Sequence, residues 1–417
     1  MDGPPMKRFA IIQLSLCLLS LNISVNAADF IDLASFPDWF KESVEREIEV
    51  KENSKLELET FKINSQVPGK LKLESVADNY WYYTIDIGTS LPVECYVFTS
   101  FDGAANSLHA IVAYGIEASA NLNKKPLNAQ YIMGLDVGLI KDTPYLLLDK
   151  LYILGDGTNN VSGVIKGLSA RTDETLQICV HNELGYRDTF FNVFKSFTEA
   201  FIAVDGNSAF YESIYGFSVD GIPVGYAREK YTLDDEGDIN EAIDTAMLLP
   251  VDSSNISRSD SVESSWSRPD GSLINGQVLN VENSTLASQF TIQYIEEKWV
   301  VEGLLQGKEI TKTLEHDEWL MSNFGNYLAA RELLASEDDK TDFMMWVSDT
   351  DPTSVMNIKL SKIADNPNAN IKYDIGILAM DLNVDDNGTI RSGRWSQGPI
   401  NMDITLMYAK GEPVVKK

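Results

Sequence analysis

Residues 289–314 read QFTIQYIEEKWVVEGLLQGKEITKTL. Three runs rich in β-branched, aromatic and other apolar residues are separated by Glu296-Glu297 and by Gln306-Gly307-Lys308. Short polar breaks between strand-forming runs are typical of hairpin turns. The stretch therefore predicts an antiparallel meander in the second half of the chain.

A helix and further strands are predicted after this meander. Leu320, Phe324 and Leu328 are spaced four apart, which predicts an amphipathic helix near 317–334. More strand candidates lie at 343–348, 355–363, 371–382 and 401–408. A curved sheet packed on a helix would cover one apolar face of each. We therefore expect a mostly antiparallel β domain of this kind at 273–417.

The first half of the chain mixes strand and helix patterns. Phe190, Phe194, Phe197 and Phe201 are spaced four, three and four apart, which predicts a helix with one aromatic face. Other helices are expected near 37–48 and 103–113, and strands at 80–87, 95–98, 131–140, 145–154, 161–170 and 175–181. We expect an N-terminal α+β domain at 28–250 and an α+β fold class for the whole chain.

A change of composition separates the two halves. Eight serines lie between Ser253 and Ser267, and the stretch ends at Arg268-Pro269-Asp270-Gly271. Serine-rich polar sequence buries little apolar surface, and a Pro-Asp-Gly run favours a turn. Residues 251–272 are therefore predicted to be a linker between the two domains.

The first residues have the pattern of a secretory signal peptide. Lys7 and Arg8 precede an apolar run, and small residues mark a cleavage site ahead of Ala28. No later stretch reaches the roughly 20 apolar residues that a membrane-spanning helix needs. We expect a signal peptide at 1–27 and a soluble exported protein, located in the periplasm or, as the alternative, outside the cell.

Cysteine usage predicts one disulfide. The chain has three cysteines, and Cys17 lies in the predicted signal peptide, so Cys95 and Cys179 remain. An even pair in an oxidising compartment favours a bond between them, with two separate buried thiols as the alternative.

The charge balance argues against some partners. Lys and Arg number 34 against 62 Asp and Glu, which gives a net charge of −28. Such a charge repels nucleic acids and anionic membranes. We therefore expect no nucleic-acid partner.

Catalytic and metal-binding motifs are not recognisable in the sequence. The three histidines, His109, His181 and His316, do not have the spacing of paired metal ligands. The sequence also contains no Gly-x-Ser-x-Gly motif. We therefore assign no catalytic residue, metal or cofactor, and favour a protein that is not an enzyme.

Two sets of residues are candidates for ligand binding. Tyr186 and Arg187 precede the aromatic helix, where an Arg at a helix start could hold an anion, although a strand end and a helix cap would explain them as well. Trp299 and Phe324 lie in the predicted meander and helix of the second half. The surplus of apolar residues there predicts a concave apolar surface, with a closed core as the alternative.

Function follows only in outline from these patterns. We expect an exported, non-catalytic envelope protein that binds an apolar small molecule or acts in assembly with another envelope protein. The alternative is a periplasmic hydrolase that uses a pair of carboxylates. A deep apolar pocket within 273–417 would favour binding, whereas carboxylates that converge with Tyr and Arg would favour hydrolysis. The sequence predicts no oligomeric state.

Overall fold

Most of the chain after the predicted signal peptide is described by a computed structural model. The described residues are 36–100, 103–202, 209–316, 318–348, 351–376, 378–397 and 400–414. The predicted signal peptide lies outside them and stays a prediction. Strands make up 55% of the structure and helices 16%, so the fold is mostly β and the predicted α+β class is wrong. The difference arises mainly between Tyr211 and Glu282, where no element is predicted and five strands are found.

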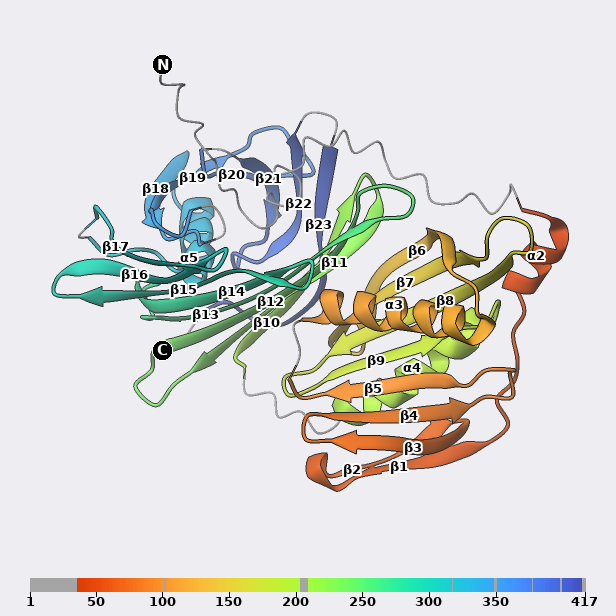
Figure 1. Ribbon diagram of the computed structural model, residues 1–417. Coiled ribbons are helices and arrows are strands. Elements are labelled where there is room, and N and C mark those ends of the chain that lie inside the picture. Colours follow the sequence, from red (N-terminus) through yellow and green to blue (C-terminus); the bar gives the residue numbers. More distant parts are fainter. Residues whose placement is uncertain are drawn as a thin grey trace, which may run out of the picture.

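A seven-stranded antiparallel sheet forms the N-terminal half, with the strand order β3-β4-β5-β9-β8-β7-β6 (Figure 1). Its strands are β3 (Lys70–Ala77), β4 (Tyr80–Asp86), β5 (Val93–Phe98), β6 (Leu127–Ile140), β7 (Thr143–Leu154), β8 (Val161–Arg171) and β9 (Leu176–His181). Helix α3 (Ala104–Asn123) packs on one face and α4 (Arg187–Ile202) on the other. The four phenylalanines of α4 are buried in its core, as their spacing predicts.

Smaller elements precede this sheet. They are α2 (Asp38–Val44), β1 (Asn53–Leu58), the short 3-10 helix η2 (Glu59–Phe61) and β2 (Ile63–Pro68). The β1–β2 hairpin shares a core with α4, so it covers the same face of the sheet.

The C-terminal half is a 14-stranded sheet made of two meanders. The first contains β10 (Tyr211–Val219), β11 (Ile222–Leu233), β12 (Ile239–Pro250), β13 (Ile256–Ser267), β14 (Leu273–Glu282), β15 (Thr285–Ile295), β16 (Lys298–Leu305) and β17 (Lys308–Thr313). Helix α5 (Asn323–Ala335) follows, and then β18 (Lys340–Met345), β19 (Met356–Lys362), β20 (Ile371–Asp374), β21 (Ala379–Val384), β22 (Ile390–Gln397) and β23 (Ile400–Gly411). Pairing of β10 with β23 joins the two meanders into one sheet.

This second sheet curves around α5 (Figure 1). Ala330 and Leu333 of the helix share a buried core with Tyr215 of β10, Leu360 of β19 and Met402 of β23. Because these strands belong to both meanders, the sheet wraps around the helix from two sides. The curved sheet is larger than the one expected at 273–417, since β10 to β13 are also part of it.

The serine-rich segment is a strand and the predicted linker at 251–272 is wrong for most of its length. Strand β13 pairs with β12 on one side and β14 on the other. Two of its buried serines have acceptors on the neighbouring strands: Ser265 Oγ donates to Glu241 (2.9 Å) and Ser261 Oγ to Asn280 (2.9 Å), whereas the buried Ser267 Oγ has no hydrogen-bond partner. The sheet therefore continues through the expected boundary between 28–250 and 273–417.

The structure contains the predicted disulfide. Cys95 of β5 lies directly opposite Cys179 of the neighbouring strand β9, with 4.1 Å between the Cα atoms and an S–S bond of 2.05 Å. Both residues are fully buried.

Asp260 of β13 ties the second sheet to the N-terminus of α3. Its carboxylate accepts hydrogen bonds from the backbone N–H groups of Ala105 (2.9 Å) and Asn106 (2.8 Å), and from the Asn106 side-chain amide (2.7 Å). The first N–H groups of a helix have no partner within the helix and need such an acceptor. Gly103, at the N-cap, has no side chain to offer, and a Cβ there would lie 2.1 Å from Asp260 Cγ. Asp260 therefore takes the place of the local cap.

Candidate functional site

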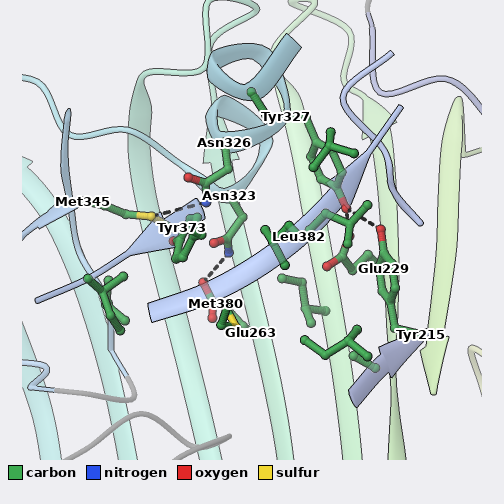
Figure 2. A pocket seen from close by; sticks show the side chains of 18 of the residues that line it. Tyr215, Glu229, Glu263, Asn323, Asn326, Tyr327, Met345, Tyr373, Met380 and Leu382 are labelled. Atoms are coloured by element: carbon green, nitrogen blue, oxygen red, sulfur yellow. Dashed lines mark hydrogen bonds between the residues drawn. The ribbon is translucent and has the colours of Figure 1, made fainter. Parts of the chain in front are cut away.

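A cavity of about 310 Å³ lies between the curved sheet and α5 (Figure 2). Its wall contains side chains of β10 to β13, α5 and β18 to β23. Apolar members of the wall include Phe217, Ile243, Leu360, Ile371, Met380 and Leu382. The volume is at the lower end of the range of small-molecule sites, and the wall is mainly apolar with a few polar groups, which makes the cavity a candidate for a binding site.

Glu229 of β11 is an acidic group in this apolar wall. Its carboxylate accepts hydrogen bonds from the hydroxyls of Tyr327 and Ser213, the latter at 3.1 Å. Burial raises the pKa of Glu229, while these two hydrogen bonds act in the opposite direction. Glu229 is half-buried, so the site holds a carboxylate that is partly removed from bulk water and faces the cavity.

Two tyrosine hydroxyls lie beside this carboxylate. Tyr215 Oη of β10 and Tyr327 Oη of α5 are 3.2 Å apart, and Figure 2 shows both side chains directed towards Glu229. Burial raises the pKa of each tyrosine well above its ordinary value. Both hydroxyls therefore stay neutral and can donate or accept hydrogen bonds near neutral pH.

Two amides of α5 provide further polar groups in the wall. Asn323 Nδ2 donates to Glu263 Oε1 of β13 at 3.0 Å, and Asn326 Nδ2 contacts Met345 Sδ at 3.5 Å (Figure 2). The helix thus presents a polar side to the cavity, whereas the sheet contributes most of the apolar surface.

Glu241 of β12 is a second acid close to the cavity, and it is fully buried. Tyr231 Oη (3.0 Å) and Ser265 Oγ (2.9 Å) donate to its two carboxylate oxygens. Burial raises the pKa of Glu241 to about 7, with a further contribution from the negative charge of Glu229. The two acids therefore disfavour each other's ionisation.

Basic side chains do not take part in the cavity wall as far as the described residues show. The wall can accept hydrogen bonds through Glu229 and the tyrosines, but it offers no positive charge to an anion. Its chemistry suits an apolar molecule whose polar end donates hydrogen bonds.

Replacement of Glu241 by glutamine tests whether burial raises the pKa of this acid. A pKa raised from 4.5 to about 7 means that the folded protein binds a proton more readily than the unfolded chain. The contribution of Glu241 to stability is therefore present below about pH 4.5 and is lost as the pH rises towards 7. Urea unfolding measures the difference in the free energy of unfolding between Glu241→Gln and the wild type. Because only the wild type loses this contribution, we expect the difference to shift by about 3 kcal/mol in favour of the variant from pH 4 to pH 8.

Glu236→Gln is the control, because Glu236 is an exposed acid in the β11–β12 hairpin. The free energy of unfolding of Glu236→Gln should differ from that of the wild type by the same amount at pH 4 and at pH 8. A difference for Glu241→Gln that is equally constant would contradict the raised pKa.

The ligand-binding candidates from the sequence do not line this cavity. Trp299 is fully buried in a separate core and donates from Nε1 to the Glu318 carbonyl (2.9 Å). Phe324 is fully buried in an aromatic cluster with Tyr211, Tyr231 and Tyr327, adjacent to the cavity but behind its wall.

Tyr186 and Arg187 lie at the N-terminus of α4, which packs on the other sheet. Arg187 Nε lies 3.6 Å from Asp149 Oδ2, and the Tyr186 backbone N–H donates to the Arg46 carbonyl (2.5 Å). Arg46 also lies over the Tyr186 ring at 5.6 Å. These contacts give both residues structural partners, and the structure does not bring them together with Trp299 or Phe324.

Glu229 and Tyr327 line the cavity but are not predicted as site residues from the sequence. A local signal for Glu229 exists, because Ala227, Glu229 and Tyr231 alternate along β11 and face the cavity together. A charged residue between two inward-facing positions of a strand is unusual and can mark a site. That signal is visible only once residues 222–233 are known to be a strand.

Two features are absent from the described residues. None of their helices is long and apolar enough to cross a membrane. No group of three or more His, Cys, Asp and Glu among them is arranged to hold a metal ion.

Comparison with known proteins adds little to this picture. No protein-family model matches the chain, and no curated protein matches it significantly. Among solved structures, the chain is similar to a β-barrel-like protein of a domain of unknown function (DUF1849) from Brucella abortus. The sequences are 13% identical, the match covers 48% of this chain and 96% of that one, and the TM-score is 0.38.

Proposed function

We propose that this chain is an exported, non-catalytic binding protein whose cavity takes an apolar molecule with a hydrogen-bond-donating end. The observation that carries the proposal is the cavity between the curved sheet and α5, with its mainly apolar wall and the Glu229 carboxylate. The proposed export rests on the signal peptide pattern at 1–27 alone.

The apolar wall supports the binding of a hydrocarbon part. Each CH₂ group that moves from water into such a wall contributes about 0.8 kcal/mol. A short chain or a small ring system would therefore gain appreciable affinity before any polar contact is made.

Glu229 supports a preference among polar ends. A hydroxyl or ammonium group can donate a hydrogen bond to its carboxylate, whereas an ionised carboxylate has no hydrogen to donate. An anionic end would also meet two acids, Glu229 and Glu263, without a basic partner among the described wall residues. Alcohols and amines should accordingly bind more tightly than fatty acids of the same length.

The hydrolase alternative has less support. Carboxylates and tyrosines do converge here, but no arginine is part of the described wall.

A competition experiment tests the proposed ligand class. The neutral apolar dye N-phenyl-1-naphthylamine is added to the purified protein, and dodecanol, dodecylamine or dodecanoate is titrated against it while the dye fluorescence is recorded. We expect dodecanol and dodecylamine to displace the dye at concentrations at least tenfold lower than dodecanoate.

Two variants locate the effect in the cavity. Glu229→Gln should reduce the preference for dodecanol and dodecylamine over dodecanoate to less than threefold in displacing concentration. Glu236→Gln gives a protein of the same net charge and should retain the full preference. Ala227→Trp places a large ring in the cavity wall and should abolish dye binding with the far-ultraviolet circular dichroism unchanged. Saturable binding that survives Ala227→Trp, or no binding by folded wild type, would refute the proposal.

A further inference from the structure

A lysine occupies a core position of the first sheet. Leu146, Leu148, Tyr152 and Leu154 alternate along β7 and belong to the core beneath α3. Lys150 is the middle member of this row and is 1% exposed. A strand pattern of this kind places an apolar residue there, so a buried ammonium group requires a physical reason.

Two other basic side chains meet Lys150 between the two sheets. Nε2 of His109, on α3, lies 3.4 Å from Lys150 Nζ and 3.5 Å from Nη1 of Arg258, on β13. Arg258 Nη1 also donates to the Ile256 carbonyl at 3.4 Å. Arg258 Nε is buried and has no hydrogen-bond partner. Basic side chains from α3, β7 and β13 therefore meet at one place. The distances between their nitrogen atoms, 3.4 and 3.5 Å, are long for hydrogen bonds.

An acidic partner for these groups is not found among the described residues. Neither Lys150 nor Arg258 forms an ion pair there, although the chain carries 62 acidic residues. Burial, and then Arg258, lowers the pKa of Lys150 to about 8. Burial, and then Lys150 and Arg258, lowers the pKa of His109 to about 3. Buried positive charge without a counter-ion is strongly unfavourable, and a bound anion would remove that penalty.

We propose that His109, Lys150 and Arg258 form a binding site for a small oxyanion at the junction of the two sheets. The anion accepts hydrogen bonds from the free Nε–H of Arg258 and from the ammonium group of Lys150. Oxygen atoms in a fixed arrangement, as in phosphate or a carboxylate, suit the planar guanidinium and the point charge of the lysine. The bound anion contacts α3, β7 and β13 together and thereby stabilises the contact between the sheets. This site is independent of the cavity around α5.

Thermal unfolding with and without an oxyanion tests the site in the full chain. Sodium phosphate or sodium acetate is titrated at constant pH, with sodium chloride to keep the ionic strength constant. We expect a saturable rise in the Tm of the wild type, and calorimetric titration should show one binding site for the more effective anion. The two arms separate a phosphoryl ligand from a carboxylate ligand.

Lys150→Met keeps the length of the side chain and removes its charge. We expect it to weaken anion binding at least tenfold and to leave the Tm without anion equal to or higher than that of the wild type. Lys298→Met, a change at an exposed lysine of β16, is the matched control and should respond to anions as the wild type does. This control also accounts for general stabilisation by phosphate.

The outcomes distinguish a site from a neutral cluster. If the wild type shows no saturable response to either anion, or if Lys150→Met responds as the wild type does, the proposal is overturned. Should Lys150→Met fail to fold, Arg258→Gln decides in its place, because Arg258 is only partly buried. If anions raise the Tm of Arg258→Gln as much as that of the wild type, the proposal is overturned. A tenfold loss of anion affinity in this variant would support it.

Discussion

Replacement of Asp260 by alanine is expected to lower the free energy of unfolding by about 3 to 4 kcal/mol. The change removes the acceptor of three hydrogen bonds and leaves the Ala105 and Asn106 N–H groups and the Asn106 amide without it. Each buried donor left without a partner costs about 1 to 3 kcal/mol. Because Asp260 is on β13 and its donors are on α3, the contact between the two sheets should weaken as well. Urea unfolding measures the effect.

Two variants distinguish the loss of the hydrogen-bond acceptor at the start of α3 from the loss of a negative charge. Asp260→Asn keeps one acceptor oxygen and the shape of the side chain, so it should lose less stability than Asp260→Ala. Asp235→Ala removes an exposed acid of the β11–β12 hairpin and should change the free energy of unfolding by less than about 0.5 kcal/mol. If Asp260→Ala is no more destabilising than Asp235→Ala, the cap does not hold α3.

Removal of the disulfide has the largest expected effect. The Cys95–Cys179 bond closes a loop with a sequence separation of 84 residues. Restricting a loop of this length in the unfolded chain corresponds to about 4.5 kcal/mol in the chain-entropy model, as an upper value. We expect the double variant Cys95→Ala/Cys179→Ala to lose stability approaching this amount, measured by urea unfolding without reductant.

Reductant provides the control for this result. Unfolding of the wild type should shift towards that of the double variant when the reductant is present, whereas the double variant should not respond. A non-reduced digest of the wild type should contain the two cysteine peptides linked to each other. Two free thiols in native protein would rule out the bond and the loss of stability attributed to it.

Local patterns account for the elements that the sequence predicts correctly. The phenylalanines of α4 repeat with the period of a helix, and the three runs at 289–314 become β15, β16 and β17. A predicted strand at 371–382 is instead two strands, β20 and β21, because the chain turns where Ile375 N donates to the Leu378 carbonyl (3.0 Å).

Strands β10 to β14 have no comparable local pattern. They contain buried polar residues, such as Glu212, Glu241 and Ser265, at positions where period-two alternation would place apolar ones. Their stability as strands comes from pairing on both sides and from partners in other elements. The serine content of β13, considered alone, therefore predicts a linker. Pairing with β12 and β14 makes the same segment a central strand.

The sequence by itself determined the aromatic helix, the meander of β15 to β17 and the net charge, and it favoured the pairing of Cys95 with Cys179 that the structure contains. These depend on residues close in the chain or on a count with few alternatives. Only the tertiary structure decided that the fold is mostly β, that β13 continues the sheet, and that Glu229 meets Tyr327 in a cavity. The physical reason is distance along the chain: 98 residues separate Glu229 from Tyr327, and 154 separate Asn106 from Asp260, so no local pattern encodes either contact.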